Sequence, residues 1–176
     1  MARGGSRMNI FALSDNPEDA AEMLCDKHLS KMVVESAQMM ASALRFHGAT
    51  DKDMPLTLHG KPYKGGYPNH PCTRWTQENR SNFAWLARHA IALAGQFTSR
   101  YGHSHACLLP INHMYSMCED YLPDGDRTPF AQAMPEEYKM SNAILAYRQY
   151  YHTKTFAKWG GSRHAPNWWQ GVEVTA

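Results

Sequence analysis

One stretch of the sequence, CDKHLSKMVVESAQMMASAL (residues 25–44), combines an apolar helical pattern with side chains that are costly to bury. On a helical wheel of about 100° per residue, one narrow stripe holds the polar side chains His28, Lys31, Glu35, Gln38 and Ser42. The remaining positions from 32 to 44 are almost all Met, Val, Ala or Leu. Because a surface helix has a broad polar face, this stripe faces the interior or a pocket.

Two interpretations of the stripe remain open. Burial of an unpaired charge costs free energy. Lys31 and Glu35, four residues apart, could therefore form an internal ion pair beside a His28 whose hydrogen bonds are satisfied. Alternatively, the stripe is the wall of a substrate pocket, where Glu35 and His28 exchange protons and Lys31 anchors an anion. We favour the pocket because five polar groups share one line. Glu35, His28 and Lys31 are then the predicted catalytic residues, and Gln38 is a predicted substrate ligand.

A second polar cluster surrounds a predicted helix start in HPCTRWTQENRSNFAW (residues 70–85). Helix N-termini bind anions through free N–H groups, and arginine grips phosphate with two parallel hydrogen bonds. The predicted substrate-binding residues of this cluster are His70, Arg74, Trp75, Arg80 and Asn82. The alternative is a solvated first helical turn followed by a core tryptophan.

A third segment, AYRQYYHTKTFAKW (residues 146–159), alternates basic and aromatic side chains. Cations bind phosphates and flat rings stack on displaced bases, so this pattern suits nucleic acid. The predicted DNA-binding residues are Tyr147, Arg148, Tyr151, Lys154 and Lys158, together with Lys64 from a lysine-containing loop. The alternative is an amphipathic helix whose tyrosines belong to the core.

Helical signals dominate the elements that must position these residues. Helices are predicted over 17–46 (long enough that it could be broken), 73–100, 128–135 and 141–158. Irregular segments are expected at 8–14 (a lone strand or an extended lead-in), 48–72, 101–127 and beyond 158. The sequence therefore predicts a mainly α protein, a single compact helical domain with long irregular loops. Residues 8–176 would form this catalytic domain, and residues 1–7 a disordered lead or a cloning remnant.

Composition excludes several classes of protein. The net charge is +2, and the basic excess falls in residues 48–100 and 139–176. The four cysteines form no C-x-x-C pair, so we expect reduced thiols, and no apolar run has the length of a membrane span. Cys25/His28, His70/Cys72 and His103/His105/Cys107 offer close metal ligands, but no finger or deaminase spacing is present. We expect no metal and no cofactor.

Several ordered motifs together resemble a family of small phage proteins. These motifs are MNIFALS…CDKHLSKMVVESAQMM, NHPCTRW…NRSNFAWL…HA, FAQAMPEEYK and AYRQYY…FAKW…PNWW, and they span most of residues 8–169. The chain resembles the amino acid:DNA transferases of thymidine hypermodification. The resemblance implies an enzyme of the host cytoplasm that acts on double-stranded DNA. It would replace the phosphate of a phosphorylated 5-hydroxymethyluracil with the amine of a free amino acid such as glycine.

The residues fit the demands of such a reaction. A phosphate leaving group needs cations, for which Lys27, Lys31, Arg80, Arg148 and Lys154 are available. An incoming ammonium must lose a proton, and Glu35 or His28 could accept it. The modified base must leave the helical stack, which calls for aromatic walls such as Trp75 or Tyr151. The amine could displace phosphate directly, which we favour, or a nucleophile such as Cys25 could first add at C6.

Two other functions remain open. One is a phage DNA glycosylase or lyase that also extrudes a base and forms a covalent imine. The other is a non-catalytic DNA-binding phage protein, in which changes at Glu35 and His28 would leave function intact.

Overall fold

The computed structural model describes residues 8–171, and within them the chain is helical, with no strand and one isolated β-bridge between Leu56 and Pro62. The elements are α1 (Pro17–Met23), α2 (Asp26–Phe46), α3 (Pro71–Gln77), α4 (Arg80–Tyr101), α5 (Leu108–Ser116), α6 (Cys118–Tyr121), the 3-10 helix η1 (Glu136–Tyr138) and α7 (Ala143–Tyr151). This confirms the predicted mainly α, compact fold. The predicted lead at 1–7 lies outside the described residues.

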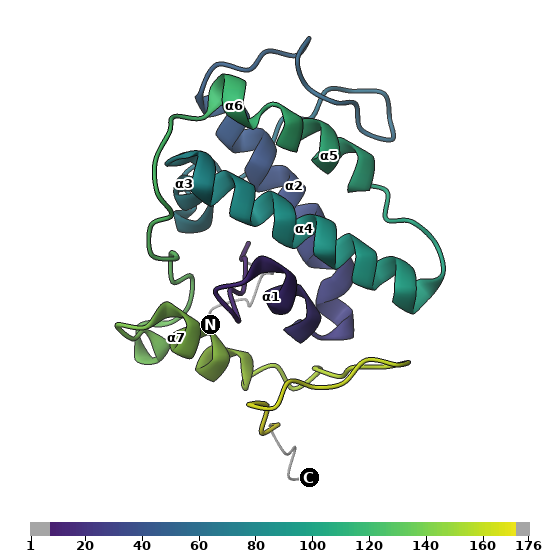
Figure 1. Ribbon diagram of the computed structural model, residues 1–176, viewed down its shortest axis with the longest axis vertical. Helices are drawn as coiled ribbons and strands as arrows, with labels where there is room; N and C mark the ends of the chain where they lie inside the picture. Colours follow the sequence, from purple (N-terminus) through teal and green to yellow (C-terminus); the bar gives the residue numbers. More distant parts are fainter. Residues whose placement is uncertain (1–7, 172–176) are drawn as a thin grey trace, which may run out of the picture.

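The two long helices form the centre of the molecule. α2 crosses behind α4, α1 packs on α4, and α3 packs on α2 (Figure 1). α2 is buried on most sides, as its composition predicts, with Leu29, Met32, Val33, Met39 and Met40 all at 1% exposure or less. α5 and α6 lie over one end of this pair, while α7 and the C-terminal segment lie at the other end (Figure 1).

The first predicted helix is broken into α1 and α2. Asn16 caps α1 by accepting a hydrogen bond from the N–H of Asp19, and Pro17 occupies the first turn, as predicted. Leu24 and Cys25 are extended, with ψ of 140° and 164°, which ends α1 and starts α2 in a new direction. The stripe residues from 28 to 42 all lie on α2 and keep their predicted helical spacing.

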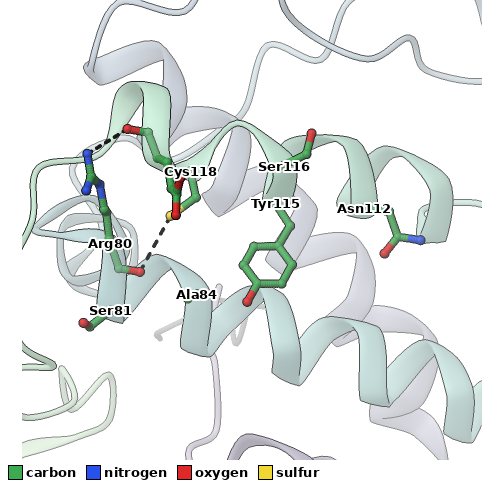
Figure 2. A pocket seen from close by; sticks show the side chains of 8 residues that line it. Arg80, Ser81, Ala84, Asn112, Tyr115, Ser116 and Cys118 are labelled. Atoms are coloured by element: carbon green, nitrogen blue, oxygen red, sulfur yellow. Dashed lines mark hydrogen bonds between the residues drawn. The ribbon is translucent and has the colours of Figure 1, made fainter.

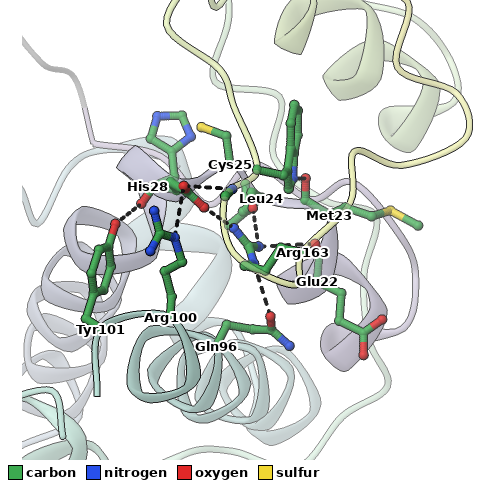
Figure 3. A network of polar contacts seen from close by, with 12 residues as sticks. Glu22, Met23, Leu24, Cys25, His28, Gln96, Arg100, Tyr101 and Arg163 are labelled. Atoms are coloured by element: carbon green, nitrogen blue, oxygen red, sulfur yellow. Dashed lines mark hydrogen bonds and ion pairs between the residues drawn. The ribbon is translucent and has the colours of Figure 1, made fainter. Parts of the chain in front are cut away.

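The break between α1 and α2 is held by a carboxylate from the start of α2 (Figure 3). Asp26 is 5% exposed, and its carboxylate accepts from Arg163 Nη1 at 2.8 Å and from the N–H of Gly160 at 2.9 Å. Arg100 Nε donates to the same carboxylate at 3.3 Å. Arg163 also donates to the carbonyl of Leu24, so one guanidinium ties the C-terminal segment to both helices. Burial would raise the pKa of Asp26, but these hydrogen bonds outweigh it and lower the pKa.

The second predicted helix is also broken, at Glu78–Asn79. Asn79 is extended, with φ of −163°, and its side chain caps α4 by accepting from the N–H of Asn82 at 2.9 Å. At the other end, Gly102 has φ of 79°, a conformation that favours glycine and ends the helix as a C-cap.

Three predictions of local structure were wrong. Residues 128–135 form no helix, because the side chain of Asn82 pairs with both the N–H and the hydroxyl of Thr128 and holds the segment extended. The range 101–127, expected to be irregular, contains α5 and α6. The last helix ends at Tyr151 rather than near 158, because the chain turns there to reach Asp26.

We predict that Asp26→Asn lowers the free energy of unfolding by about 3 kcal/mol, because it leaves the buried guanidinium of Arg163 without its carboxylate. The matched control is Glu18→Gln, which breaks the half-exposed Arg88–Glu18 ion pair and should cost less than about 1 kcal/mol. Urea denaturation measures both variants. Equal losses for the two would show that the Asp26 network does not hold the C-terminal segment in place.

Candidate active site

Glu35 is the buried acidic group of α2. Its side chain is 8% exposed, and its Oε2 atom is buried without a hydrogen-bond partner among residues 8–171. Burial raises the pKa of Glu35 to about 7, although the charge of Lys31 and the backbone N–H of Asn9 oppose this rise. Near neutral pH the carboxyl therefore exists in both protonation states. A group with these properties can accept a proton and release it again.

The internal ion pair considered as an alternative for α2 is not formed. None of the ion pairs found between residues 8 and 171 joins Lys31 to Glu35. Lys31 is half-buried and influences Glu35 through its charge, without closing a salt bridge over it.

His28 lies one helical turn before Lys31 and is held by aromatic groups. Its ring stacks on Phe11 at a centroid distance of 4.7 Å, and its Nδ1 lies 2.8 Å from the hydroxyl oxygen of Tyr151. That oxygen accepts from the N–H of Cys25 at 2.9 Å, so the phenol proton is free to point at His28 Nδ1. This arrangement places the imidazole proton on Nε2.

Burial, together with the charges of Lys31, Lys154 and Lys27, lowers the pKa of His28 to about 3. The ring is therefore neutral at physiological pH and a poor proton acceptor. Its Nε2–H is a hydrogen-bond donor. The two proton acceptors considered from sequence thus differ: Glu35 can accept a proton near neutral pH, whereas His28 stays neutral and can donate from Nε2.

The irregular segment 8–14 completes the surroundings of these two residues. The side chain of Asn9 accepts from the N–H groups of Ile10 and Phe11 and donates to the carbonyl of Ala133 at 2.8 Å. Phe11 has a φ of 51°, which is uncommon for a residue with a side chain and turns its ring onto His28. Sequence analysis missed Asn9 and Phe11, because an irregular segment has no periodic pattern to mark its contacts.

The predicted substrate ligands lie in two places. Gln38 is half-buried on α2, one turn after Glu35. His70 caps α3 by accepting from the N–H of Cys72 at 3.1 Å. Burial raises the pKa of Cys72 to about 12, and Glu35 is close enough for its charge to contribute to this rise. α3, which His70 caps, packs on α2.

The other four predicted ligands have their own contacts elsewhere. Trp75 is 2% exposed and donates to the carbonyl of Thr128, while fully buried Asn82 donates to the carbonyl of Trp75 at 2.7 Å. Arg80 donates to the carbonyls of Leu122 and Glu119 at 2.9 and 2.8 Å. Arg74 is exposed. These contacts hold the α3–α4 junction and the following loop, and a role for the four residues in substrate binding stays a prediction.

The predicted DNA-binding tyrosines are both at 0% exposure. Tyr147 donates from its hydroxyl to the carbonyl of Ala131, and Tyr151 bonds to His28 as described. Both rings are buried, which agrees with the alternative that the tyrosines belong to the core, and their role in DNA binding stays a prediction. Between them, Arg148 donates to the carbonyl of Leu13 at 2.9 Å and so holds the N-terminal segment.

The three predicted DNA-binding lysines differ in their surroundings. Lys64 is exposed and pairs with Asp51 at 3.1 Å, at the far end of α2. Lys158 is exposed, and its backbone carbonyl accepts from the N–H of Asp26. Lys154 is half-buried, and its charge reaches His28. The structure thus brings Lys154 to the catalytic candidates.

Two cavities lie on the outer side of α4. The first, of about 590 Å³, is lined by Arg80, Ser81, Ala84, Asn112, Tyr115, Ser116, Cys118 and Glu119 (Figure 2). The second, of about 460 Å³, shares Ser81 and Ala84 with it and extends to Asp15 and Arg127. Neither is lined by His28, Lys31 or Glu35, so neither is the substrate pocket predicted at the polar stripe of α2.

Two further features bear on the class of site. Among residues 8–171, no three His, Cys, Asp or Glu side chains gather closely enough to hold a metal ion. No helix in the same part of the chain has the length and apolar character needed to cross a membrane.

Comparison with known families connects this arrangement to DNA. Residues 8–109, more than half of the chain, match the family described as pyrimidine dimer DNA glycosylase. The chain belongs to this family. The match includes the N-terminal segment and α1 to α4, and so Asn9, Phe11, His28 and Glu35, but it ends before α7 and Lys154. No curated protein and no solved structure matched the chain.

Membership of the pyrimidine dimer DNA glycosylase family confirms the coarser part of the sequence prediction. The protein is a DNA-acting enzyme, and DNA is its partner.

We predict that the imidazole signals of His28 stay in the neutral Nε2–H form from pH 8 to pH 5, because the folded-state pKa is about 3. Since this pKa lies below the unfolded value of about 6.5, the contribution of His28 to stability is present above pH 6.5 and is lost as the pH falls towards 3. Long-range ¹H–¹⁵N spectra, with free imidazole added as a titrating reference, measure the tautomer. A His28 ring that titrates together with the reference would contradict this assignment.

Proposed function

We propose that the protein is an amino acid:DNA transferase. It replaces the phosphate of a phosphorylated 5-hydroxymethyluracil in double-stranded DNA with the amine of an amino acid such as glycine. The observation that carries this proposal is Glu35, a buried carboxyl without a hydrogen-bond partner for Oε2 among the described residues and with a pKa raised to about 7. The resemblance to phage transferases supports the choice of substrate, and the proposed location is the cytoplasm of the phage host.

The proposed reaction is a direct displacement. The amine nitrogen attacks the exocyclic methylene carbon, the C–O bond to the phosphate breaks, and the phosphate leaves with the bonding electrons. Glu35 accepts the proton that the attacking amine loses and later passes it to solvent. Lys31 and the Nε2–H of His28 stabilise the negative charge on the leaving phosphate.

The cysteines favour displacement over addition at C6. Cys25 is fully buried and lies in the extended break before α2. Cys72, the other thiol near the site, has a pKa raised to about 12 by burial, and a thiol in this state is a weak nucleophile. Cys25 is therefore shielded from a substrate, and Cys72 does not supply the thiolate that the addition route requires.

A second candidate function follows from the family match. In a glycosylase with lyase activity, an amine of the protein attacks the sugar carbon C1′, the base leaves, and an imine forms between protein and sugar. Lys31 is an amine beside a carboxyl able to accept its proton. The two reactions would use the same residues, but only the lyase forms a covalent bond between the protein and the DNA.

One experiment separates these functions. The protein is incubated with a duplex that contains phosphorylated 5-hydroxymethyluracil and with a mixture of amino acids, and the nucleosides are analysed by mass spectrometry. A parallel sample contains a duplex with a pyrimidine dimer and borohydride. The proposal predicts an amino acid linked to the thymine methyl carbon and no trapped protein–DNA adduct. A trapped adduct with no amino acid incorporated would establish the lyase instead.

We predict that Glu35→Gln abolishes turnover by removing the base while it stabilises the fold. The folded pKa of Glu35 lies above its ordinary value of 4.5, so its contribution to stability is present below pH 4.5 and is lost as the pH rises through 7. At pH 8 the variant should therefore be more stable than the wild type, by up to about 3 kcal/mol, since one pKa unit corresponds to about 1.4 kcal/mol.

Single-turnover rates and urea denaturation test this pair of effects. The control is Glu119→Gln, which removes an exposed carboxylate from the far side of α4. A Glu35→Gln variant with the wild-type rate would remove Glu35 as the base.

A further inference from the structure

Three lysines lie around His28. Lys27 and Lys31 come from the first two turns of α2, and Lys154 comes from the segment after α7. None of the three takes part in an ion pair within residues 8–171. Asp26, the acid adjacent to Lys27, is already bound to Arg163 and Arg100.

Aromatic rings fix the positions of two of these lysines relative to His28. The ammonium of Lys27 lies 4.7 Å from the ring centroid of Phe156, and that ring meets His28 edge-on at 5.4 Å. The ammonium of Lys154 lies 4.1 Å from the ring centroid of Tyr150 and 5.3 Å from that of Phe11, the ring that stacks on His28 at 4.7 Å. Each of the two cations therefore lies beside a ring that contacts the imidazole.

This arrangement is unfavourable in the absence of an anion. Lys27 and Lys31 stand four residues apart on one helix, where like charges repel. Lys154 adds to that repulsion. The neutral imidazole of His28 carries no negative charge that could offset it. A bound anion would offset the repulsion of all three ammonium groups and could also accept the Nε2–H of His28.

We infer that Lys27, Lys31, Lys154 and the Nε2–H of His28 form a binding subsite for a phosphate group of the DNA substrate. The inference rests on the proposed function and adds to it the group that the cations recognise. Two phosphates could fill the subsite: the phosphate monoester on the modified base, or a phosphodiester of the backbone beside it. Phe156, which is 40% exposed, borders the subsite and provides an apolar edge against the DNA.

The test is equilibrium binding, with no amino acid present, to three duplexes of one sequence. One carries phosphorylated 5-hydroxymethyluracil, the second carries 5-hydroxymethyluracil, and the third carries thymine. The variants are Lys27→Met, Lys154→Met and the double variant. The matched control is Lys52→Met, which removes the same charge from an exposed position in the loop at the other end of α2 (Figure 1).

The inference predicts that each single variant weakens binding roughly tenfold, the loss expected for one charge-assisted hydrogen bond, while Lys52→Met has little effect. If the subsite holds the monoester, the loss is confined to the phosphorylated duplex. If it holds the backbone, all three duplexes weaken equally, and the salt dependence of each falls by about one phosphate contact. Affinities that match those of Lys52→Met on every duplex would overturn the inference.

A second measurement tests the subsite without turnover and without a DNA duplex. Inorganic phosphate should shift the His28 Nε2–H resonance of the wild type, and this shift should be lost in the double variant. Because no reaction is required, a protein that binds phosphate here but transfers no amino acid would refute the proposed function alone. A His28 resonance that does not respond to phosphate would refute the subsite.

Discussion

A carboxyl group buried in the central helix without a salt bridge is the feature on which this account depends. Transfer of an ionised carboxylate out of water is costly unless a partner offsets it. Burial therefore favours the protonated form of Glu35 and raises its pKa to about 7. A Lys31–Glu35 ion pair would have removed the cost and with it the ability to exchange protons near neutral pH. The absence of that pair within the described residues makes α2 less stable and better suited to acid–base chemistry.

Segments distant in sequence hold this carboxyl and its neighbours in place. The N-terminal segment brings the Asn9 backbone to Glu35 and the Phe11 ring to His28. The C-terminal segment supplies Tyr151 and Lys154, and it is fastened by the contact between Asp26 and Arg163, which are 137 residues apart. The site is thus made at the point where both ends of the described chain meet the start of α2. The family match covers the first of these segments and α2, and it ends before the C-terminal segment.

Part of this arrangement was predictable from sequence. The helical period fixes the angle between successive side chains around the axis. The polar stripe from His28 to Ser42 and the buried faces of α2 therefore followed from residue spacing alone. The hydrogen bonds of Trp75 and Asn82 did not, because a sequence does not reveal which backbone carbonyl a polar side chain will bond to. The stacking of Phe11 on His28 and the extended break at Leu24–Cys25 also depend on long-range contacts. Thr128 followed by Pro129 is a local signal for the start of a helix, and the helix predicted at 128–135 was wrong for the same reason. Hydrogen bonds from the distant Asn82 hold that segment out of a helix.

The most direct test of the account is the titration of the Glu35 carboxyl itself. The ¹³C signal of the Glu35 side-chain carboxyl, assigned by its loss in Glu35→Gln, is followed from pH 3 to pH 9 in the folded protein. The account predicts a midpoint near 7, and a higher midpoint in Lys31→Met, where the stabilising positive charge is absent. A midpoint at or below the ordinary value of 4.5, or one that does not respond to the loss of Lys31, would contradict the claim that this buried carboxyl is the proton acceptor.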